Sequence, residues 1–419
     1  MMNNLSRSLR MVSLLLWIPL SIVAAPGEDS GFVAIRGVDI IDPGGSPVLL
    51  RGINLGNWLV PEGYMFAFDS ATSPRLINQA LTELVGPEEA RSFWSMYRDV
   101  YVTREDIRLI KSLGMNSVRV PFSWRLFLAD EAPDLWLDAG FEMLDRLISW
   151  CAEETLWVIL DMHCAPGGQT GENIDDSWGY PYLFESPAAQ ERTCALWKEI
   201  AKRYARNRTV VGYDLLNEPI APYFDTERLN RLLEPLYRRI VEGIRQVDPN
   251  HLVFLGGAQW NTNFEVFGPP FDDKAVYTFH RYWCDTTQNV VQEFLDFREH
   301  YGVPIWMGES GENTEEWISA FRRLLEQNSI GWCFWPYKKM GSATCMVTFD
   351  RPQSWQRIVE YANKPRSGFP GIRASRPPID QTRTALRAFL EAAAFERTRL
   401  NNAFVEALGC SVVETEAGK

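Results

Sequence analysis

The sequence is poor in the residues that build metal centres. Among its 419 residues there is no Cys-X-X-Cys pair and no His-X-His pair, so neither a zinc knuckle nor a thioredoxin motif is indicated. Only four histidines are present: His163, His251, His280 and His300. The sequence therefore predicts no metal site and disfavours a metal-dependent hydrolase.

Positive charge is also scarce. There are 42 Lys and Arg against 54 Asp and Glu, which gives a net charge of −12. A surface that binds nucleic acid or an anionic membrane gathers Lys and Arg, and this composition shows no such excess, so we expect no nucleic-acid partner. The hydrophobic fraction of 46% and the charged fraction of 23% exclude a disordered or collagen-like chain.

Long apolar runs are missing after the N-terminus. Arg7 and Arg10 precede an apolar stretch over residues 11–23, which ends in the small residues Ala24 and Ala25. This pattern predicts a signal peptide over residues 1–25; the alternative is a retained membrane anchor, but the run is shorter than the ~20 apolar residues of a span. We expect an exported protein, periplasmic or extracellular, with no stable membrane association after cleavage.

Cysteine is sparse for an exported chain. The seven cysteines are an odd number, so at least one thiol stays unpaired or pairs with another molecule. Because a chain of this length can bury a large core, we expect at most one or two disulfides.

What the sequence does have is a repeated alternation of apolar strands and amphipathic helices. This rhythm predicts an α/β protein, a (β/α)8 TIM barrel, although the crossover after the fifth strand is weak because residues 261–273 resemble a loop. The predicted strands are residues 48–55, 117–122, 157–163, 210–217, 251–257, 275–283, 304–309 and 330–336. The predicted helices are residues 103–113, 137–154, 188–205, 226–247, 289–301, 314–327 and 354–363.

Three segments exceed a minimal barrel. Residues 32–50 predict a hairpin that turns at residues 42–45, and residues 60–102 expand the first βα loop and carry short helices of their own. Beyond the catalytic domain, which we place at residues 26–365, residues 366–419 comprise a Pro- and Gly-rich connector over 366–378 and a C-terminal helix. The apolar face of that helix predicts packing on the barrel, with a partner protein as the alternative.

Polar residues end almost every predicted strand, where a barrel places its active site. Glu218 and Glu309 end the fourth and seventh strands and could cleave a glycosidic bond, one as the acid and the other as the nucleophile. We expect Arg119 and a neighbouring His to keep Glu309 ionised, and a nearby second carboxylate to raise the pKa of Glu218. A separation of about 5–5.5 Å would indicate a retaining mechanism.

The ordered motifs resemble glycoside hydrolase family 5. They are Arg51-Gly52-Ile53-Asn54-Leu55-Gly56-Asn57-Trp58, Asn116-Ser117-Val118-Arg119-Val120-Pro121, Leu215-Leu216-Asn217-Glu218-Pro219, His280-Arg281-Tyr282, Gly308-Glu309-Ser310 and Phe334-Trp335-Pro336-Tyr337-Lys338. The resemblance implies a retaining β-glycosidase on a (β/α)8 barrel that needs no metal or organic cofactor.

The same resemblance implies a role for each matched residue. Glu218 would be the acid/base and Glu309 the nucleophile. The substrate-binding residues would be Asn54, Glu62, Arg119, His163, Asn217, His280, Tyr282 and Trp335. Among them Arg119 and Tyr282 would position the nucleophile, and Trp335 would be the floor on which the sugar stacks. The loop over residues 56–62 and residues 165–169 look most like the exo-β-1,3-glucanase branch, in which Glu62 matches a residue that contacts the terminal sugar.

Some features depart from that branch. Cys164 follows His163 where the branch favours Gly, Cys284 follows the His280–Tyr282 motif, and the loop over residues 169–184 is longer and richer in acids and aromatics. The carboxylates of this loop are expected to be solvated or to cap the loop, with substrate selection as the alternative. The sequence also has 16 Trp, whose flat rings suit sugar faces. The candidate platforms are Trp58, Trp124, Trp178, Trp260, Trp283 and Trp335.

Taken together, the residues predict an exported retaining β-glycoside hydrolase, β-glucosidase- or glucanase-like, acting on β-glucan or related β-linked oligosaccharides. The alternatives are a β-mannan or glycoconjugate hydrolase of the same family and a catalytically silent carbohydrate-binding barrel. The presence of both Glu218 and Glu309 argues against the silent barrel.

Overall fold

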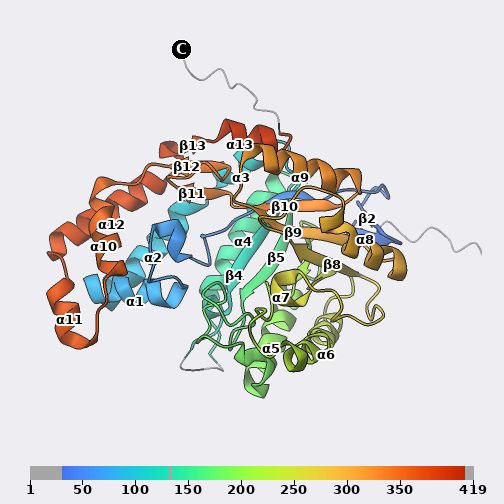
Figure 1. Ribbon diagram of the computed structural model, residues 1–419, viewed down its shortest axis with the longest axis horizontal. Helices are drawn as coiled ribbons and strands as arrows, with labels where there is room; N and C mark the ends of the chain where they lie inside the picture. The colour runs from blue at the N-terminus through green and yellow to red at the C-terminus, as the bar shows by residue number, and fades with distance from the viewer. Residues whose placement is uncertain (1–30, 131, 133–134, 411–419) are drawn as a thin grey trace, which may run out of the picture. The chain divides into compact units, whose positions relative to one another are not determined.

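The computed structural model describes residues 31–130, 132 and 135–410. Eight parallel strands close into a barrel in the order β10-β3-β4-β5-β6-β7-β8-β9, with helices around it (Figure 1). The strands are β3 (Arg51–Asn54), β4 (Ser117–Ser123), β5 (Trp157–Cys164), β6 (Val210–Asp214), β7 (Leu252–Gly256), β8 (Ala275–His280), β9 (Ile305–Gly311) and β10 (Gly331–Trp335). The predicted (β/α)8 barrel is confirmed: β3 begins three residues after its predicted start, and every other barrel strand begins within one residue of it.

The helices between the strands also follow the predicted pattern. They are α3 (Arg104–Ser112), α4 (Asp138–Glu153), α5 (Pro187–Tyr204), α6 (Thr226–Arg245), α8 (Asn289–Tyr301) and α9 (Glu315–Gln327). Each buries its apolar stripe against the barrel, as its helical spacing requires. The weak fifth crossover contains only α7 (Ala258–Asn261), followed by a loop, because two consecutive prolines at 269–270 disfavour a helix there.

The N-terminal hairpin has two turns instead of one. β1 (Ala34–Arg36) and β2 (Asp39–Ile41) pair antiparallel across Gly37, which adopts a positive φ of 61°. The predicted turn at residues 42–45 follows, and Ile41 then bridges Pro47. The first turn was missed because a single Gly is a weaker turn signal than Asp42-Pro43-Gly44-Gly45.

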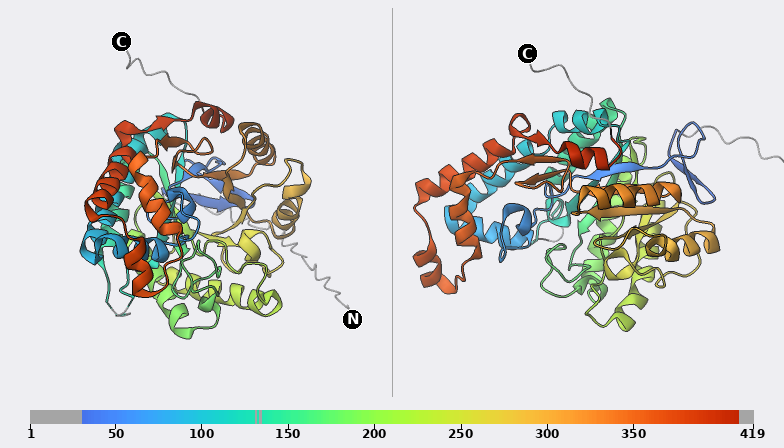
Figure 2. Two further views of the ribbon diagram at one scale, coloured as in Figure 1. Left: turned by 60° about the vertical axis from the view of Figure 1, so that its left-hand side comes forward. Right: turned by 45° about the horizontal axis from the view of Figure 1, so that its top comes forward.

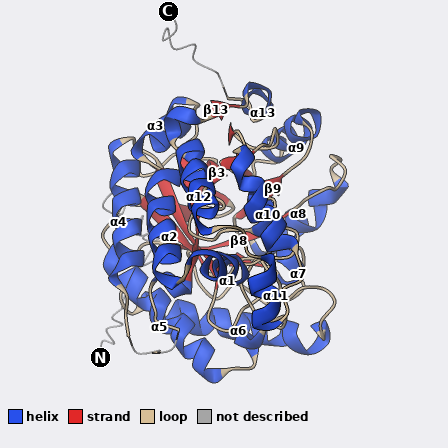
Figure 3. Cartoon of the chain, turned by 90° about the vertical axis from the view of Figure 1, so that its left-hand side faces the viewer, coloured by secondary structure: helices blue, strands red, loops and turns tan. Residues whose placement is uncertain are grey.

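The expanded first βα loop forms longer helices than expected. After η1 (Gly63–Phe66) come α1 (Pro74–Val85) and α2 (Pro87–Tyr101). Ser73 caps α1 by accepting a hydrogen bond from the Leu76 N–H, and proline at the first position of each helix suits the fixed φ of that residue. These helices lie with α10 (Gln356–Asn363) and α12 (Ile379–Ala393) on the same side of the barrel (Figures 2 and 3).

The C-terminal region differs from the predicted connector and single helix. The connector contains α11 (Gly368–Ser375), and the helix is broken into α12 and α13 (Asn402–Ala407) by η5 (Phe395–Arg397) and β13 (Arg399–Leu400). The break occurs because β13 pairs antiparallel with β12 (Val347–Phe349), which in turn pairs with β11 (Lys338–Met340). α13 packs against a barrel helix, α9, whereas α12 packs mainly on α1, α2, α10 and η4 (Gln353–Trp355).

Two further findings concern the whole of the described chain. All seven cysteines are free thiols. Among residues 31–410, apart from the undescribed positions 131, 133 and 134, no helix has both the length and the apolarity of a membrane span. The predicted signal peptide lies outside the described residues.

The strand register brings the polar strand ends to one level. Asn54 pairs with Arg119 across β3 and β4, Asp161 pairs with Asp214 across β5 and β6, and His280 pairs with Glu309 across β8 and β9. The β8–β9 register shifts next to His280, which is how a bulge redirects a side chain at a barrel rim. These side chains therefore converge at the carboxyl ends of the strands.

Candidate active site

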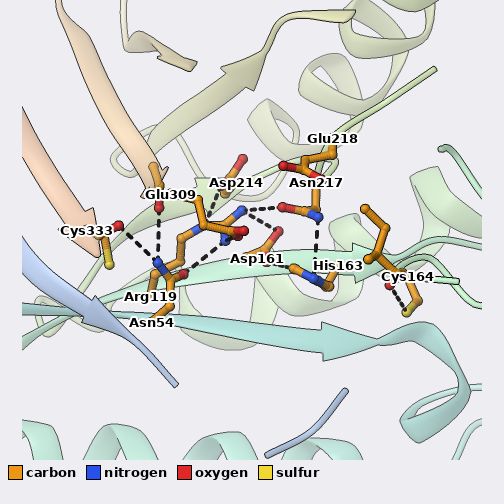
Figure 4. Close-up of polar contacts among 12 residues, drawn as sticks. Asn54, Arg119, Asp161, His163, Cys164, Asp214, Asn217, Glu218, Glu309 and Cys333 are labelled. Carbon is orange, nitrogen blue, oxygen red and sulfur yellow. Dashed lines mark hydrogen bonds and ion pairs between the residues drawn. The ribbon is translucent and has the colours of Figure 1, made fainter. Parts of the chain in front are cut away.

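A buried guanidinium stands at the centre of the site (Figure 4). Arg119 is fully buried, and its Nε donates to Asp214 Oδ2 at 2.8 Å. Its Nη1 donates to Asn54 Oδ1 at 3.0 Å and to Glu309 Oε2 at 2.9 Å. Its Nη2 lies 3.2 Å from Asp161 Oδ1. Arg119, on β4, thus joins residues from four other strands, which fixes their relative positions.

The charges around Arg119 compensate one another. Burial by itself would lower the pKa of Arg119, but the carboxylates of Asp161, Asp214 and Glu309 outweigh it and raise that pKa. Burial raises the pKa of Asp161 and of Asp214 to about 7, against the opposing effect of Arg119. A buried cation of this kind is retained only because every carboxylate near it is close enough to pair with it.

Glu309 is held at both carboxylate oxygens. Arg119 donates to Oε2, and the Tyr282 hydroxyl donates to Oε1 at 2.9 Å. Burial, followed by the charge of Glu218, raises the pKa of Glu309, although His280 and Arg119 lower it. Arg119 and the histidine thus favour the ionised form of Glu309, as expected, but burial of the carboxylate acts more strongly in the opposite sense.

Glu218 lies just past the end of β6 in a left-handed backbone conformation, with φ of 46°. Such a conformation is uncommon outside Gly and Asn and is a feature of functional sites. Burial raises the pKa of Glu218 to about 7. The expected direction is thus correct, but the main cause is the loss of water, and the carboxylates that add to it are Asp161 and Glu172.

A neutral histidine supports Glu218. His280 Nδ1 lies 2.8 Å from Glu218 Oε1, and the Asn261 amide nitrogen lies 3.1 Å from His280 Nε2. Because an amide NH2 group can only donate, Nε2 accepts and the ring proton resides on Nδ1, which donates to Glu218. Burial lowers the pKa of His280 to about 3, so the ring is uncharged near neutral pH.

A second histidine forms a parallel chain. His163 Nδ1 lies 2.8 Å from Asp161 Oδ2, and its Nε2 lies 3.4 Å from Asn217 Nδ2. Asn217 Oδ1 accepts from Arg119 Nη2 at 2.9 Å, which fixes the orientation of the amide. Burial lowers the pKa of His163 to about 4, so this ring is also neutral near pH 7.

The cavity above these groups has a volume of about 600 Å³, a size suited to a small sugar. Trp335 forms one wall: its ring stacks on His163 with 5.8 Å between centroids, and its Nε1 donates to the Tyr64 hydroxyl at 2.9 Å. A Cβ on Gly56 would lie 2.5 Å from the Trp335 ring, so only glycine fits there. The cavity is lined by Glu62, Tyr64, His163, Glu172, Asn173, Ile174, Glu218, Trp260, Thr262, His280, Tyr282, Trp283, Glu309, Glu312 and Trp335.

Each predicted site residue lies at this cavity or directly beneath it. Asn54, Arg119 and Asn217 lie beneath, and the other seven predicted residues line the wall. Glu62 is 5% exposed, its Oε1 has no hydrogen-bond partner, and burial raises its pKa well above the usual range. A buried oxygen without a partner is available to a ligand hydroxyl.

The carboxylates of the loop after β5, residues 169–184, have two different roles. Asp175 accepts hydrogen bonds from the N–H groups of residues 170, 171, 172 and 177, and Asp176 pairs with Arg75 and Arg125. These two carboxylates hold the loop together, as expected. Glu172 instead lines the cavity, where its charge contributes to the raised pKa of Glu218.

The six candidate tryptophans also fall into three groups: buried, exposed and cavity-lining. Trp58 and Trp124 are buried core residues, and Trp178 is exposed and stacks on the Arg75 guanidinium at 3.6 Å. The other three, Trp260, Trp283 and Trp335, line the cavity.

Sequence reasoning missed several contributors. Asp214 ends β6, within the predicted strand over residues 210–217, and a charge in that apolar run was the available signal for it. Asp161 lies near the end of the predicted strand over residues 157–163, but it is not among the predicted site residues. Asn261 ends the one-turn helix α7 and Tyr64 lies in η1, and both elements are too short for periodicity to indicate which side chain points inward.

Two carboxylates face each other at the mouth of the cavity. One oxygen of Glu218, one nitrogen of His280 and one oxygen of Glu309 lie within 4.8 Å of one another. Both His280 nitrogens are engaged, with Glu218 and with Asn261, so the ring has no free lone pair for a metal ion. A close carboxylate pair at the carboxyl ends of barrel strands defines the class of (β/α)8 glycoside hydrolases.

Comparison with known proteins agrees with this class. Residues 79–341, more than half of the chain, match the family Cellulase (glycosyl hydrolase family 5). The chain belongs to glycosyl hydrolase family 5 and is a β-glycoside hydrolase.

Several relatives illustrate the breadth of the family. A protein named Beta-xylosidase from Phanerodontia chrysosporium is 29% identical over 350 residues, which cover 74% of this chain and 71% of the relative. Endoglucanase C of Acetivibrio thermocellus is 27% identical over 304 residues, which cover 58% of this chain and 85% of the relative. A probable glucan 1,3-beta-glucosidase A of Aspergillus fumigatus is 32% identical over 211 residues, 49% of each chain. The crystal structure of an endogalactoceramidase shares the fold, with a TM-score of 0.59 at 16% identity over 90% of this chain and 84% of that one.

Proposed function

We propose that the chain hydrolyses β-glucan or a related β-linked oligosaccharide with retention of configuration, through a covalent glycosyl-enzyme. The observation that carries this proposal is the pair Glu218 and Glu309, with carboxylate oxygens within 4.8 Å across a cavity of sugar size. That separation suits a nucleophile that attacks directly, whereas inverting enzymes separate their carboxylates by about 6.5–9.5 Å to admit a water.

In the first step Glu309 attacks the anomeric carbon while Glu218 protonates the departing oxygen. Arg119 and Tyr282 hold the Glu309 oxygens in place, so the attacking geometry exists before substrate enters. His280 donates to Glu218 Oε1, which leaves Oε2 to carry the proton. In the second step Glu218, now ionised, takes a proton from water, which attacks the anomeric carbon and releases Glu309.

The test is a product profile with a matched variant. Purified wild type and Glu309→Gln are incubated with β-1,3- and β-1,4-gluco-oligosaccharides, xylo- and manno-oligosaccharides and aryl β-glycosides. Wild type should release sugar with a β-configured first product, and the nearly isosteric variant should lose activity by at least 10³-fold while folding normally. Wild-type activity in Glu309→Gln would overturn the nucleophile assignment, and turnover of mannan alone would favour the mannanase alternative.

We also propose that residues 1–25 are removed during export. Arg7 and Arg10 ahead of the apolar run, with Ala24 and Ala25 at its end, support this proposal. N-terminal sequencing of the protein recovered outside the cytoplasm should begin at Pro26, and an intact N-terminus there would contradict it.

A further inference from the structure

A row of aromatic side chains leads away from the cavity. Trp260 lines the cavity wall, and Tyr223, Phe224, Tyr180 and Tyr182 continue the row outward. Successive ring centroids are 6.4, 4.8, 5.4 and 4.9 Å apart. These five residues, the aromatic strip, come from the loops after β5, β6 and β7, so the tertiary structure alone assembles them.

Two rings of the strip are open to solvent, the other three are half-buried, and polar groups lie along its edge. Tyr223 is 59% exposed and Tyr182 is 47% exposed. The Tyr223 hydroxyl donates to Glu172, and Arg228 donates to the Tyr180 hydroxyl at 2.9 Å. Flat apolar faces with hydrogen-bonding groups beside them suit pyranose rings, which present apolar faces and hydroxyl edges.

The backbone beneath the strip is strained but firmly held. Gln259, Trp260 and Asn261 all have positive φ, near 49°, 60° and 60°, a conformation that is unfavourable for Gln and Trp and better tolerated by Asn. The Gln259 N–H donates to the Ile220 carbonyl at 3.0 Å, which joins the Trp260 turn to the Tyr223 loop. Strain that is held by specific bonds points to a functional position for the side chain.

The strip lies on the side of the acid residue. Glu172, which bonds Tyr223, acts on the pKa of Glu218, and Asn261 next to Trp260 contacts His280, which bonds Glu218. On the opposite wall, the charges of Glu309 and Glu312 act on the pKa of Glu62 more strongly than that of Glu218, and Tyr64 interacts with Glu62, Glu312 and Glu309. Since the acid protonates the leaving oxygen, the strip faces the departing part of the substrate.

We infer that the aromatic strip binds the leaving-group side of an extended β-linked glycan, over several sugar units beyond the scissile bond. The inference rests on the proposed function and narrows it: the natural substrate is a chain, and a small glycoside leaves most of the strip empty. The occupant is a carbohydrate chain because polar groups follow the rings along their length.

The test compares substrates of increasing length. For whichever of the β-1,3-gluco, β-1,4-gluco, β-1,4-xylo or β-1,4-manno series the wild type cleaves, kcat/KM is measured from two to six units and for an aryl β-glycoside. Tyr182→Ala and Tyr223→Ala should lose about tenfold in kcat/KM on the hexasaccharide and less than twofold on the aryl β-glycoside. Tyr223→Phe keeps the ring and should retain the length dependence.

Phe369→Ala is the matched control, since Phe369 is an aromatic residue on α11 that is 77% exposed and lies outside the strip. Losses on the hexasaccharide no larger than those of Phe369→Ala would overturn the inference, as would equal losses on all substrates. If the wild type cleaves the aryl glycoside but its kcat/KM does not rise with chain length, the inference about the strip is overturned. The proposed function then remains intact. Absence of turnover of every oligosaccharide series and of the aryl β-glycoside by the wild type would instead overturn the proposed function.

Discussion

The acid residue illustrates how burial sets reactivity at the scale of a single side chain. Glu218 is ionised in water at neutral pH, yet in the barrel its pKa rises to about 7 because the charged form loses its hydration. Glu309 is also raised, but two hydrogen bonds from Arg119 and Tyr282 stabilise its charge. The two carboxylates therefore differ in the groups that hydrogen-bond to them as well as in their burial.

This difference predicts the pH dependence of the enzyme. Glu218 must be protonated to act as the acid, so kcat/KM should fall as pH rises through about 7. In Glu218→Ala this alkaline limb should disappear for aryl glycosides with good leaving groups, which should also lose less activity than natural substrates. The measurement is the pH profile of both proteins; an unchanged limb in the variant would argue against the acid role.

Asn261 offers a test of the histidine tautomer. Asn261→Asp keeps the size and the tolerance for positive φ but replaces the donor with an acceptor, which forces the His280 proton onto Nε2. His280 Nδ1 then competes for the Glu218 proton, so kcat should fall about tenfold or more with little change in KM. The kcat pH profile should change too, and a change confined to KM would contradict this reasoning.

At the scale of elements, the helices that follow β3 and β10 form one packed unit beside the barrel mouth (Figure 3). Phe389 of α12 is fully buried and meets the rings of Phe66 and Trp355, with centroids at 5.3 and 4.3 Å. Phe66 belongs to η1, which also carries Tyr64 of the cavity wall. The C-terminal region thus supports the wall of the active site through the first loop.

Phe389→Ala should therefore destabilise the protein by about 3–5 kcal/mol, the range for a large ring removed from a packed core. The control is Phe369→Ala, an exposed ring whose removal should change stability by no more than about 0.5 kcal/mol. Urea unfolding of the two variants beside the wild type measures both. Equal stability of the two variants would show that α12 does not belong to the cooperative core.

At the scale of the whole molecule, the catalytic apparatus consists of the chain's own acids, amides and neutral histidines. Among the described residues, Glu218, His280 and Glu309 are the group that could hold a metal ion, and they are already bonded within the site. Full activity is expected after EDTA treatment and dialysis. A loss that Zn²⁺ or Mg²⁺ restores would contradict the metal-free mechanism, whereas rates equal to those of an untreated sample support it.

Much of this architecture could be predicted because it is local. The alternation of strands and helices follows from periodicity, and the strand ends that carry Glu218 and Glu309 follow from where apolar runs stop. The α12–α13 break could not be predicted in this way. It depends on Arg399 and Leu400 pairing with β12, about fifty residues away, and that pairing overrides the helical spacing of residues 386–408.

By itself the sequence determined the barrel, the ordered polar strand ends and hence the reaction class, because each depends on short-range pattern and strand order. Only the tertiary structure decided which groups meet: Asp161 and Asp214 around Arg119, Asn261 on His280, and the aromatic strip from three separate loops. The physical reason is that burial and hydrogen-bond partners are properties of the folded chain. Both carboxylate pKa values and the path of a long substrate depend on them.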